Sequence, residues 1–232
     1  ARNIIIATGL LSGGDRLGCD GKMLKILKKA GFKTIKTTPA IVQIKTETDI
    51  VKQLKGVKID ANATLLAEGK KLRTDFGEVL FTDYGLSGPP ILQISRGVSV
   101  SKSECEVSLD IMPDIDFSTL EEKLKVRVKE LSQRNLDEFF TGMLQKRIGQ
   151  VLLKTIGCRL SDKTETLDGQ KIKRIANLMK NWKFKVLGTT GFLNSQVTAG
   201  GLSTDEFFNT TMECKTAKGL YCIGEILDID GD

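Results

Sequence analysis

The chain contains no histidine. This absence excludes Ser-His-Asp and Cys-His nucleophile systems, histidine-ligated metal sites and an imidazole general base. The five cysteines are scattered and include no C-x-x-C pair, which argues against a zinc knuckle or a redox dithiol and favours buried free thiols. We therefore predict no metal site, and we expect the chemistry to come from a cofactor, a carboxylate or a lysine.

Long apolar runs are also absent. A membrane span needs roughly 20 apolar residues, whereas runs such as Ile4–Ala7 and Val151–Leu153 are the size of one strand or one helical turn. No charged segment followed by an apolar core, as in a signal peptide, comes after Ala1. We therefore predict no membrane association, no signal peptide and a cytoplasmic location.

The overall composition is that of a folded protein with one basic region. Of 232 residues, 40% are hydrophobic and 28% are charged, which is enough to bury a core. The net charge of +6 is uneven, because residues 118–185 hold 16 Lys and Arg against 8 Asp and Glu. The basic character therefore belongs to this segment.

Short apolar segments at the two ends predict buried parallel strands. Residues 4–9 read Ile-Ile-Ile-Ala-Thr-Gly, and residues 220–225 read Leu-Tyr-Cys-Ile-Gly-Glu. Each run stops at a glycine, as expected where a strand of a parallel sheet ends in a tight loop. A glycine-rich stretch at 12–21 follows the first run, and residues 23–30 have helical spacing closed by Gly31.

The middle of the chain predicts a β-rich part followed by a helical part. Short β-type runs between turn residues suggest an antiparallel sheet or a small barrel. These runs are residues 40–44, 57–61, 63–67, 78–82 and 105–111. A helix is expected to start near Ser87–Pro90. Apolar spacing then predicts helices at 118–131, 143–156 and 169–182, before β texture returns at 184–187, 196–198, 212–214 and 220–223.

The two end motifs resemble the internal signatures of FAD-binding Rossmann-type oxidoreductases. In those enzymes the first signature is an apolar run followed by Ala-Thr-Gly. The second signature is an apolar strand followed by Gly-Asp, and this chain has Glu225 in place of the aspartate. Carboxyl ends of parallel strands meet at the edge where the dinucleotide lies. Glycine lets the main chain approach the cofactor, and an acidic side chain accepts hydrogen bonds from ribityl hydroxyls. We therefore expect the first and last segments to lie side by side in one sheet.

A longer set of motifs is similar to a bacterial flavoprotein family with a large insert domain, of the aminoacetone-oxidase-like and bile-acid-reductase-like kind. The motifs are residues 196–201, 211–213 and 218–231, together with the insert motif at 81–89, where this chain has Asp83-Tyr84 in place of the more usual His-Phe. The resemblance covers most of the chain. It implies an oxidoreductase in which FAD transfers hydride, with NAD(P)H as the candidate electron donor.

The resemblance implies an α+β insert domain, with a β-barrel-like part and a helical part, flanked by remnants of an α/β Rossmann-type FAD-binding domain. The implied boundaries are 1–33 for the first FAD-domain remnant, 34–187 for the insert (34–117 β-rich, 118–187 helical and basic) and 188–232 for the return to the FAD domain. It implies no particular catalytic residue. The residues implied to contact FAD are Thr8, Gly9, Gly200, Gly201, Gly224, Glu225, Asp228 and Gly231.

Two departures limit this expectation. The family's G-x-G-x-x-G loop, which receives the pyrophosphate, has no counterpart before Ala1, and the chain ends at Asp232 before the family's glycine-rich turn. We therefore expect a fragment that is inactive alone and does not retain FAD by itself, with the insert shaping the substrate side of the flavin. The expected partners are a flavin nucleotide, NAD(P)H, a small-molecule substrate and, through unpaired terminal strands, a second copy.

The alternative hypothesis is a basic module that binds nucleic acid. Its candidate residues are Lys146, Arg147, Lys154, Lys171, Lys173, Arg174 and Lys180. No helix-turn-helix, RNP or zinc signature accompanies them, and a charged helix face is usually only solvated, so nucleic acid is the less favoured partner. Asp228, Asp230 and Asp232 have the spacing of a calcium loop but lack its downstream glutamate, which favours a solvated acidic terminus.

Overall fold

The computed structural model describes residues 1–229, and these form two compact units. The first unit combines Ala1–Ile44, Ser95–Lys102 and the chain from Gly188 onward, and the second combines Lys45–Ile94 with Ser103–Leu187. The chain therefore leaves the first unit twice and returns to it each time. The sequence-based domain boundaries after residues 33 and 187 stay a prediction.

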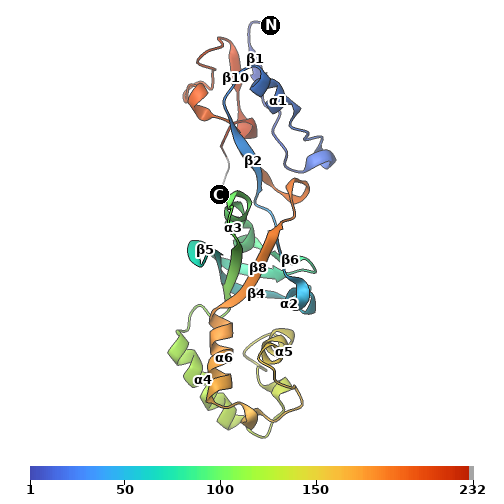
Figure 1. Cartoon of the computed structure of the whole chain (residues 1–232), viewed down its shortest axis with the longest axis vertical. Helices are drawn as coiled ribbons and strands as arrows, with labels where there is room; N and C mark the ends of the chain where they lie inside the picture. Colours follow the sequence, from blue (N-terminus) through green and yellow to red (C-terminus); the bar gives the residue numbers. More distant parts are fainter. Residues whose placement is uncertain (230–232) are drawn as a thin grey trace. The chain divides into compact units, whose positions relative to one another are not determined.

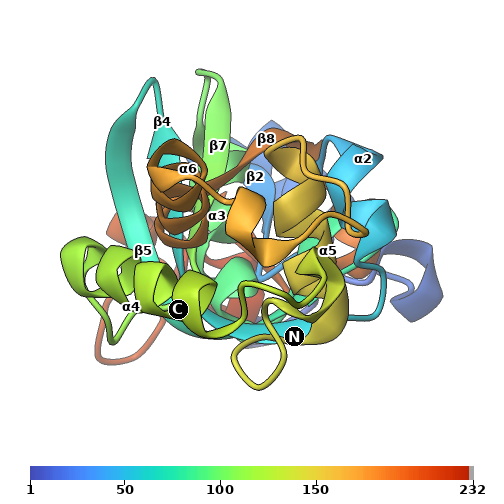
Figure 2. The same cartoon turned by 90° about the horizontal axis from the view of Figure 1, so that it is seen from below.

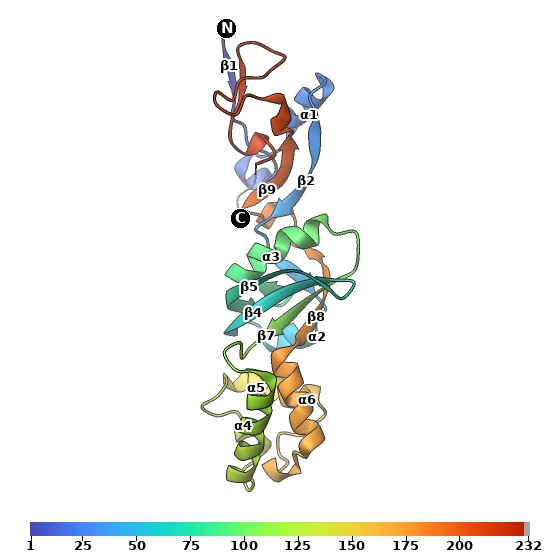
Figure 3. The ribbon, with the colours of Figure 1, turned by 90° about the vertical axis from the view of Figure 1, so that its left-hand side faces the viewer.

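The first unit contains two small sheets. Strand β1 (Ile4–Ile6) pairs in parallel with β10 (Leu220–Cys222), with Ile4 opposite Leu220 (Figure 1). Strand β2 (Thr34–Ala40) pairs antiparallel with β9 (Val197–Leu202), beside helix α1 (Lys22–Lys29) (Figure 3). The prediction that the first and last segments lie side by side in one sheet is confirmed.

Apolar side chains from both ends of the chain form the core of this unit. Ile6 and Leu10 come from the first segment and pack with Leu27 of α1 and with buried residues between 202 and 227. Phe32 stacks on Phe207, with ring centroids 6.3 Å apart. Neither end can bury these side chains alone, so the parallel pair depends on both.

The second unit contains a closed six-stranded barrel. Its strands follow the order β3–β6–β5–β4–β7–β8, and the registers of the β4–β5, β4–β7, β5–β6 and β7–β8 pairs are antiparallel. The strands are β3 (Ile44–Thr46), β4 (Lys58–Ala67), β5 (Lys70–Phe81), β6 (Gly85–Ser87), β7 (Cys105–Asp110) and β8 (Trp182–Thr189). The predicted α+β fold with a barrel-like part and helices, beside a small parallel sheet, is confirmed.

Period-two alternation explains why these residues form a barrel. Along β4, Ala61, Ala63 and Leu65 are fully buried, whereas the residues between them are partly exposed. Three aromatic rings pack together in the interior. The ring centroid of Phe81 lies 5.9 Å from that of Trp182 and 6.0 Å from that of Phe184. The interior is therefore packed with side chains, as in other small barrels.

Five further helices belong to or adjoin this unit. They are α2 (Thr48–Gln53), α3 (Pro89–Val100), α4 (Phe117–Glu130), α5 (Lys146–Thr155) and α6 (Gly169–Lys180), and α4 packs against α6 (Figure 2). The start of α3 and the helical stretches were predicted. Helix α5 begins three residues later than predicted because the Gln145 side chain accepts hydrogen bonds from the amides of Arg147 and Ile148 and caps it.

The remaining regular segments are short 3-10 turns. They are Gly14–Leu17, Leu136–Glu138, Thr164–Thr166, Phe192–Asn194, Thr204–Glu206 and Gly224–Ile226. In the part of the chain that the structure describes, every helix is too short or too polar to cross a membrane.

Four strand predictions were wrong in detail. Residues 40–44 do not form one strand, because β2 ends at Ala40, Ile41 has a positive φ of 48°, and β3 begins only at Ile44. Residues 57–61 and 63–67 form one strand, since Asn62 faces outward and does not interrupt the ladder. Residues 78–82 are only the end of β5, which begins at Lys70 after the Glu68-Gly69 turn. Residues 212–214 make isolated bridges rather than a strand, because Met212 has a positive φ of 60°.

The N-cap of α4 makes a testable prediction about acid stability. The Asp116 carboxylate accepts hydrogen bonds from the Ser118 and Thr119 hydroxyls and the Thr119 amide, which lowers its pKa below the ordinary value. A carboxyl group with a lowered folded-state pKa stabilises the fold above its unfolded pKa, and this stabilisation is lost as the pH falls. The variant Asp116→Asn keeps a capping oxygen but has no carboxyl group to protonate. We expect its Tm to fall less on acidification than the Tm of the unchanged chain, as measured by circular dichroism.

Candidate functional site

The carboxyl ends of β1 and β10 lie together and expose the two predicted glycine loops. The amide of Ile223 donates a hydrogen bond of 3.0 Å to the Ile6 carbonyl, so the two chains leave the sheet side by side. Gly9 follows β1 and Gly224 follows β10 at the same edge. The observed register agrees with the prediction that both motifs lie at this edge of the sheet.

Gly9 and Gly224 have open space beside their main chains. Both have left-handed backbones, with φ of 63° and 73°, and a Cβ built on either would meet no atom within 4 Å. A left-handed conformation favours glycine. The space beside each main chain is therefore open to a ligand, and a side chain would enter that space.

Gly200 and Gly201 have a different reason to be glycine. A Cβ on Gly200 would lie 2.4 Å from the Lys36 carbonyl oxygen, and one on Gly201 would lie 2.7 Å from the Ile226 carbonyl oxygen. Both residues are buried, and their φ values are 89° and 137°. The structure thus explains these two glycines by packing of β9 against its neighbours, and their predicted contact with FAD stays a prediction.

The Glu225 carboxylate joins three separate segments. Its Oε1 accepts a hydrogen bond of 3.1 Å from the Thr198 amide, and its Oε2 accepts one of 3.4 Å from the Ser12 hydroxyl. The Ser12 and Thr198 hydroxyls are 2.7 Å apart, and the Leu11 amide donates to the Thr198 hydroxyl at 3.1 Å. This network fixes the loop after β1 and the start of β9 relative to the Gly224 turn.

Ser12 and Thr198 are functional candidates that the sequence reasoning missed. Both stand in runs that were singled out for their glycines, 12–21 and 196–201. Nothing in the local spacing shows that Ser12 lies beside a glutamate 213 residues further along the chain. Only the fold brings these groups together.

Of the other predicted contact residues, Thr8 follows β1 and Asp228 lies beside the end of β9. Thr8 is exposed, and its hydroxyl donates to the Gly9 carbonyl at 3.4 Å. The Asp228 amide donates to the Leu202 carbonyl at 2.7 Å, and its side chain is half-buried. Gly231, Asp230 and Asp232 lie outside the described residues. In residues 1–229, no group of three acidic or cysteine side chains converges as a metal site would require.

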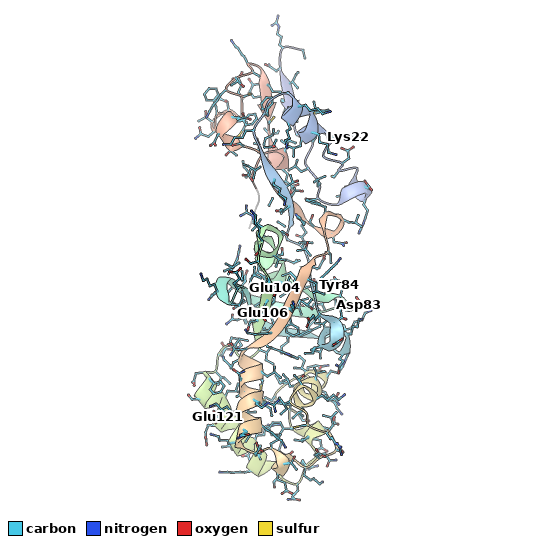
Figure 4. All side chains as sticks on the ribbon, in the orientation of Figure 1. Lys22, Asp83, Tyr84, Glu104, Glu106 and Glu121 are labelled. Carbon is cyan, nitrogen blue, oxygen red and sulfur yellow. The ribbon has the colours of Figure 1, made fainter. Side chains whose placement is uncertain are left out.

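A pocket of about 290 Å³ adjoins the glycine loop after β1. Its lining includes Thr8 and Gly9 on one side and residues 18–23 of the glycine-rich stretch on the other. Lys22 forms an ion pair of 2.7 Å with Asp20 and holds the pKa of that carboxyl below its ordinary value (Figure 4). The pocket therefore offers main-chain groups, one carboxylate and one ammonium group.

Cys222, the last residue of β10, has a thiol that is a poor nucleophile. Burial, with a smaller effect of Cys214, raises the pKa of the Cys222 thiol to about 11. A thiol with so high a pKa stays protonated near neutral pH and is a poor nucleophile. Cys222 therefore acts as a core side chain at the end of β10.

The candidate nucleic-acid face of the helices is partly used for structure. Lys180 pairs with Asp110 at 2.6 Å and donates to the Met112 and Ile115 carbonyls. Lys146 pairs with Asp137, Arg147 donates to the Gln53 and Lys55 carbonyls, and Lys171 donates to the Thr166 carbonyl. In the described part of the chain, Lys154, Lys173 and Arg174 make no such contact.

The insert motif at 81–89 forms a turn between two barrel strands. Thr82 accepts hydrogen bonds from the amides of Tyr84 and Gly85, which shapes the turn from β5 to β6. Asp83 extends from this turn and pairs with Lys55 at 2.6 Å (Figure 4). The motif is therefore explained by the geometry of the turn.

A closed barrel with a helical region is inserted in a chain whose first and last segments form a parallel strand pair, and this topology defines the class of protein. Residues 38–197 match the family described as HI0933-like protein barrel and H2TH domain. This match covers more than half of the chain, and the chain belongs to that family.

Three curated proteins are similar over nearly the whole chain. A 3-dehydro-bile acid delta(4,6)-reductase of Clostridium scindens is 30% identical over 100% of this chain and 57% of its own length. Ribosomal RNA dihydrouridine synthases of Haemophilus influenzae and Escherichia coli are 28% and 29% identical over 99% and 98% of this chain, and 55% of their own length. The chain thus spans a little over half the length of these relatives.

Proposed function

We propose that this chain is the central part of a flavin-dependent oxidoreductase, with FAD lying across the carboxyl ends of β1 and β10. The observation that carries the proposal is the parallel pairing of these strands with two open, left-handed glycines at one edge. The names of the three relatives, one a reductase and two dihydrouridine synthases, are consistent with reduction of a carbon–carbon double bond. FAD would supply the hydride transfer.

The chain's own residues would bind and orient this cofactor. Gly9 and Gly224 leave room for the dinucleotide against the main chain. Glu225 would act as a positioning residue, since its carboxylate holds Thr198 and the loop at Ser12 in place. The pocket beside Thr8 and Gly9 adjoins the same edge and would receive part of the cofactor.

The test uses the protein encoded by the complete reading frame that contains these residues. We expect it to purify with the visible absorbance of a flavin, released on denaturation as FAD. Glu225→Ala should weaken FAD retention about tenfold, because an unpaired amide at Thr198 costs about 1–3 kcal/mol and loosens the loop. Glu225→Gln is the matched control, since its amide oxygen still accepts from Thr198.

Two measurements separate cofactor positioning from a general loss of structure. The first is the Kd for FAD of the complete protein by fluorescence quenching, and the second is thermal unfolding of the 232-residue chain with the same substitution, followed through Trp182. A weaker Kd with an unchanged barrel transition supports the proposal. A protein without flavin that also fails to take up added FAD contradicts it.

A further inference from the structure

Helix α1 and strand β2 of the first unit lie side by side (Figure 3), and both line a pocket of about 410 Å³. The loop before α1 completes the lining with Leu11 and Gly21. Except for Gly21, the lining residues differ from those of the pocket beside Thr8 and Gly9. Pockets that bind small molecules enclose about 300–1,000 Å³, so this one has room for a ligand of that kind.

The charged side chains that line this pocket are all lysines. They are Lys25 and Lys28, which are three residues apart and therefore share one face of α1, and Lys36 of β2. All three are exposed, and within residues 1–229 none of them forms an ion pair. The lining contains no carboxylate that would compete for them. Three unpaired ammonium groups around one cavity favour an anionic ligand.

The sequence around the pocket is also basic. Residues 21–46 contain seven lysines and no acidic residue. Two of these lysines, Lys22 and Lys33, pair with Asp20 and Asp205, and the other five form no ion pair in the part of the chain that the structure describes. This local excess of positive charge raises the concentration of anions near the pocket.

A β-bulge in β2 brings consecutive residues to the pocket. Residues 34–37 all contribute to its lining, although successive side chains of a regular strand point to opposite faces. The register with β9 shifts between Ile35 and Thr38, so that Gly200 stands opposite two residues of β2. A bulge of this kind re-aims side chains. The close approach of the Lys36 carbonyl to Gly200, which leaves no room for a Cβ, therefore belongs to the geometry that shapes the pocket.

The rest of the lining combines apolar side chains with two hydroxyl groups. Leu11 and Leu24 are half-buried, and Ile35 is 40% exposed. Thr34 and Thr37, both half-buried, supply the hydroxyl groups. An apolar surface beside a cluster of ammonium groups suits a ligand with a flat apolar end and an anionic end. A nucleotide has this form, because its base is flat and its phosphates are charged.

From these features we infer that the pocket between α1 and β2 binds a nucleoside diphosphate. Lys25, Lys28 and Lys36 contact the phosphates, and the base lies against Leu24 and Ile35. A free terminal phosphate carries a charge of about −1.5 to −2 near neutral pH, whereas both phosphates of FAD are internal to the dinucleotide. The three lysines therefore favour a free nucleotide over FAD. The inference goes beyond the proposed flavin chemistry and does not depend on it.

The test titrates the 232-residue chain with ADP, adenosine, inorganic pyrophosphate and FAD by isothermal titration calorimetry. We expect ADP to bind most tightly, because it alone combines a base with a free terminal phosphate. The double variant Lys25→Ala/Lys28→Ala should bind ADP about tenfold or more weakly, since it loses two charge-assisted contacts. Lys29→Ala is the matched control, because it removes the same charge from the same helix outside the lining, and it should change the affinity less than about twofold.

A second variant separates the contact with the base from the contacts with the phosphates. Ile35→Ala should weaken ADP binding about threefold or more and leave pyrophosphate binding unchanged, which also shows that the pocket is still folded. The inference is overturned if ADP does not bind to the unchanged chain, if Lys29→Ala loses as much affinity as the double variant, or if FAD binds at these lysines as tightly as ADP. Pyrophosphate that binds as tightly as ADP overturns the assignment to a nucleotide.

Discussion

Phe81→Ala is expected to destabilise the barrel by about 3–5 kcal/mol, the usual cost of removing a fully buried aromatic ring. Phe81 is 0% exposed and packs between Trp182 and Phe184. Removal of its ring leaves a cavity at the centre of the interior that the surrounding strands cannot close. Chemical unfolding followed by fluorescence measures the effect, since Trp182 is the only tryptophan in the sequence and lies beside the cavity.

The matched control is Phe76→Ala on the same strand. Phe76 is 58% exposed, so its loss should change the free energy of unfolding by less than about 0.5 kcal/mol. The two variants remove the same atoms and differ only in the side of β5 from which they are removed. Equal unfolding midpoints for both would show that Phe81 does not lie in the barrel interior.

The second large effect is expected at the paired glycines of the first unit. Gly200→Ala should destabilise that unit by about 2–5 kcal/mol, because a left-handed alanine costs about 1–2 kcal/mol and overpacking about 1–3 kcal/mol. Its Cβ would lie 2.4 Å from the Lys36 carbonyl oxygen. Gly224→Ala, which meets no atom within 4 Å, should incur only the conformational cost of about 1–2 kcal/mol.

The same pair of variants discriminates between structural and cofactor roles. If FAD lies against Gly224, the added methyl group occupies its approach and should weaken FAD retention about tenfold or more in the complete protein. Unfolding curves and FAD titrations together give both quantities. If the Gly224→Ala protein retains flavin as well as the unchanged protein does, Gly224 does not belong to the proposed site, whatever the stability of the variant.

The sequence predicts elements whose pattern is local. Helices α4 and α6 were predicted from apolar spacing, and the structure adds that the carboxylates of Asp116 and Asp168 cap their N-termini. The pairing of β1 with β10 was predicted because both motifs resemble signatures of strands that end at a common dinucleotide-binding edge. The continuity of β4 through Asn62 was not predicted, since a polar residue in a strand looks like a break until the outward-facing row on neighbouring strands is known.

The candidate site shows the same limit. Glu225, Gly9 and Gly224 are recognisable from their motifs, but the partners of Glu225 are not. Ser12 and Thr198 reach that carboxylate only because β1, β9 and β10 meet in three dimensions. Gly200 and Gly201 looked equivalent to the other glycines in sequence, and only the positions of neighbouring carbonyl oxygens distinguish them.

The β1–β10 pair also has a consequence for biosynthesis. Ile4 is translated more than two hundred residues before its partner Leu220. Contacts of such long sequence separation form late in folding, whereas the barrel and helices between them can assemble as soon as they emerge. Until then the Ile4–Ile6 segment lacks its β10 partner, and a chaperone that holds it during elongation would protect this unpaired edge from aggregation.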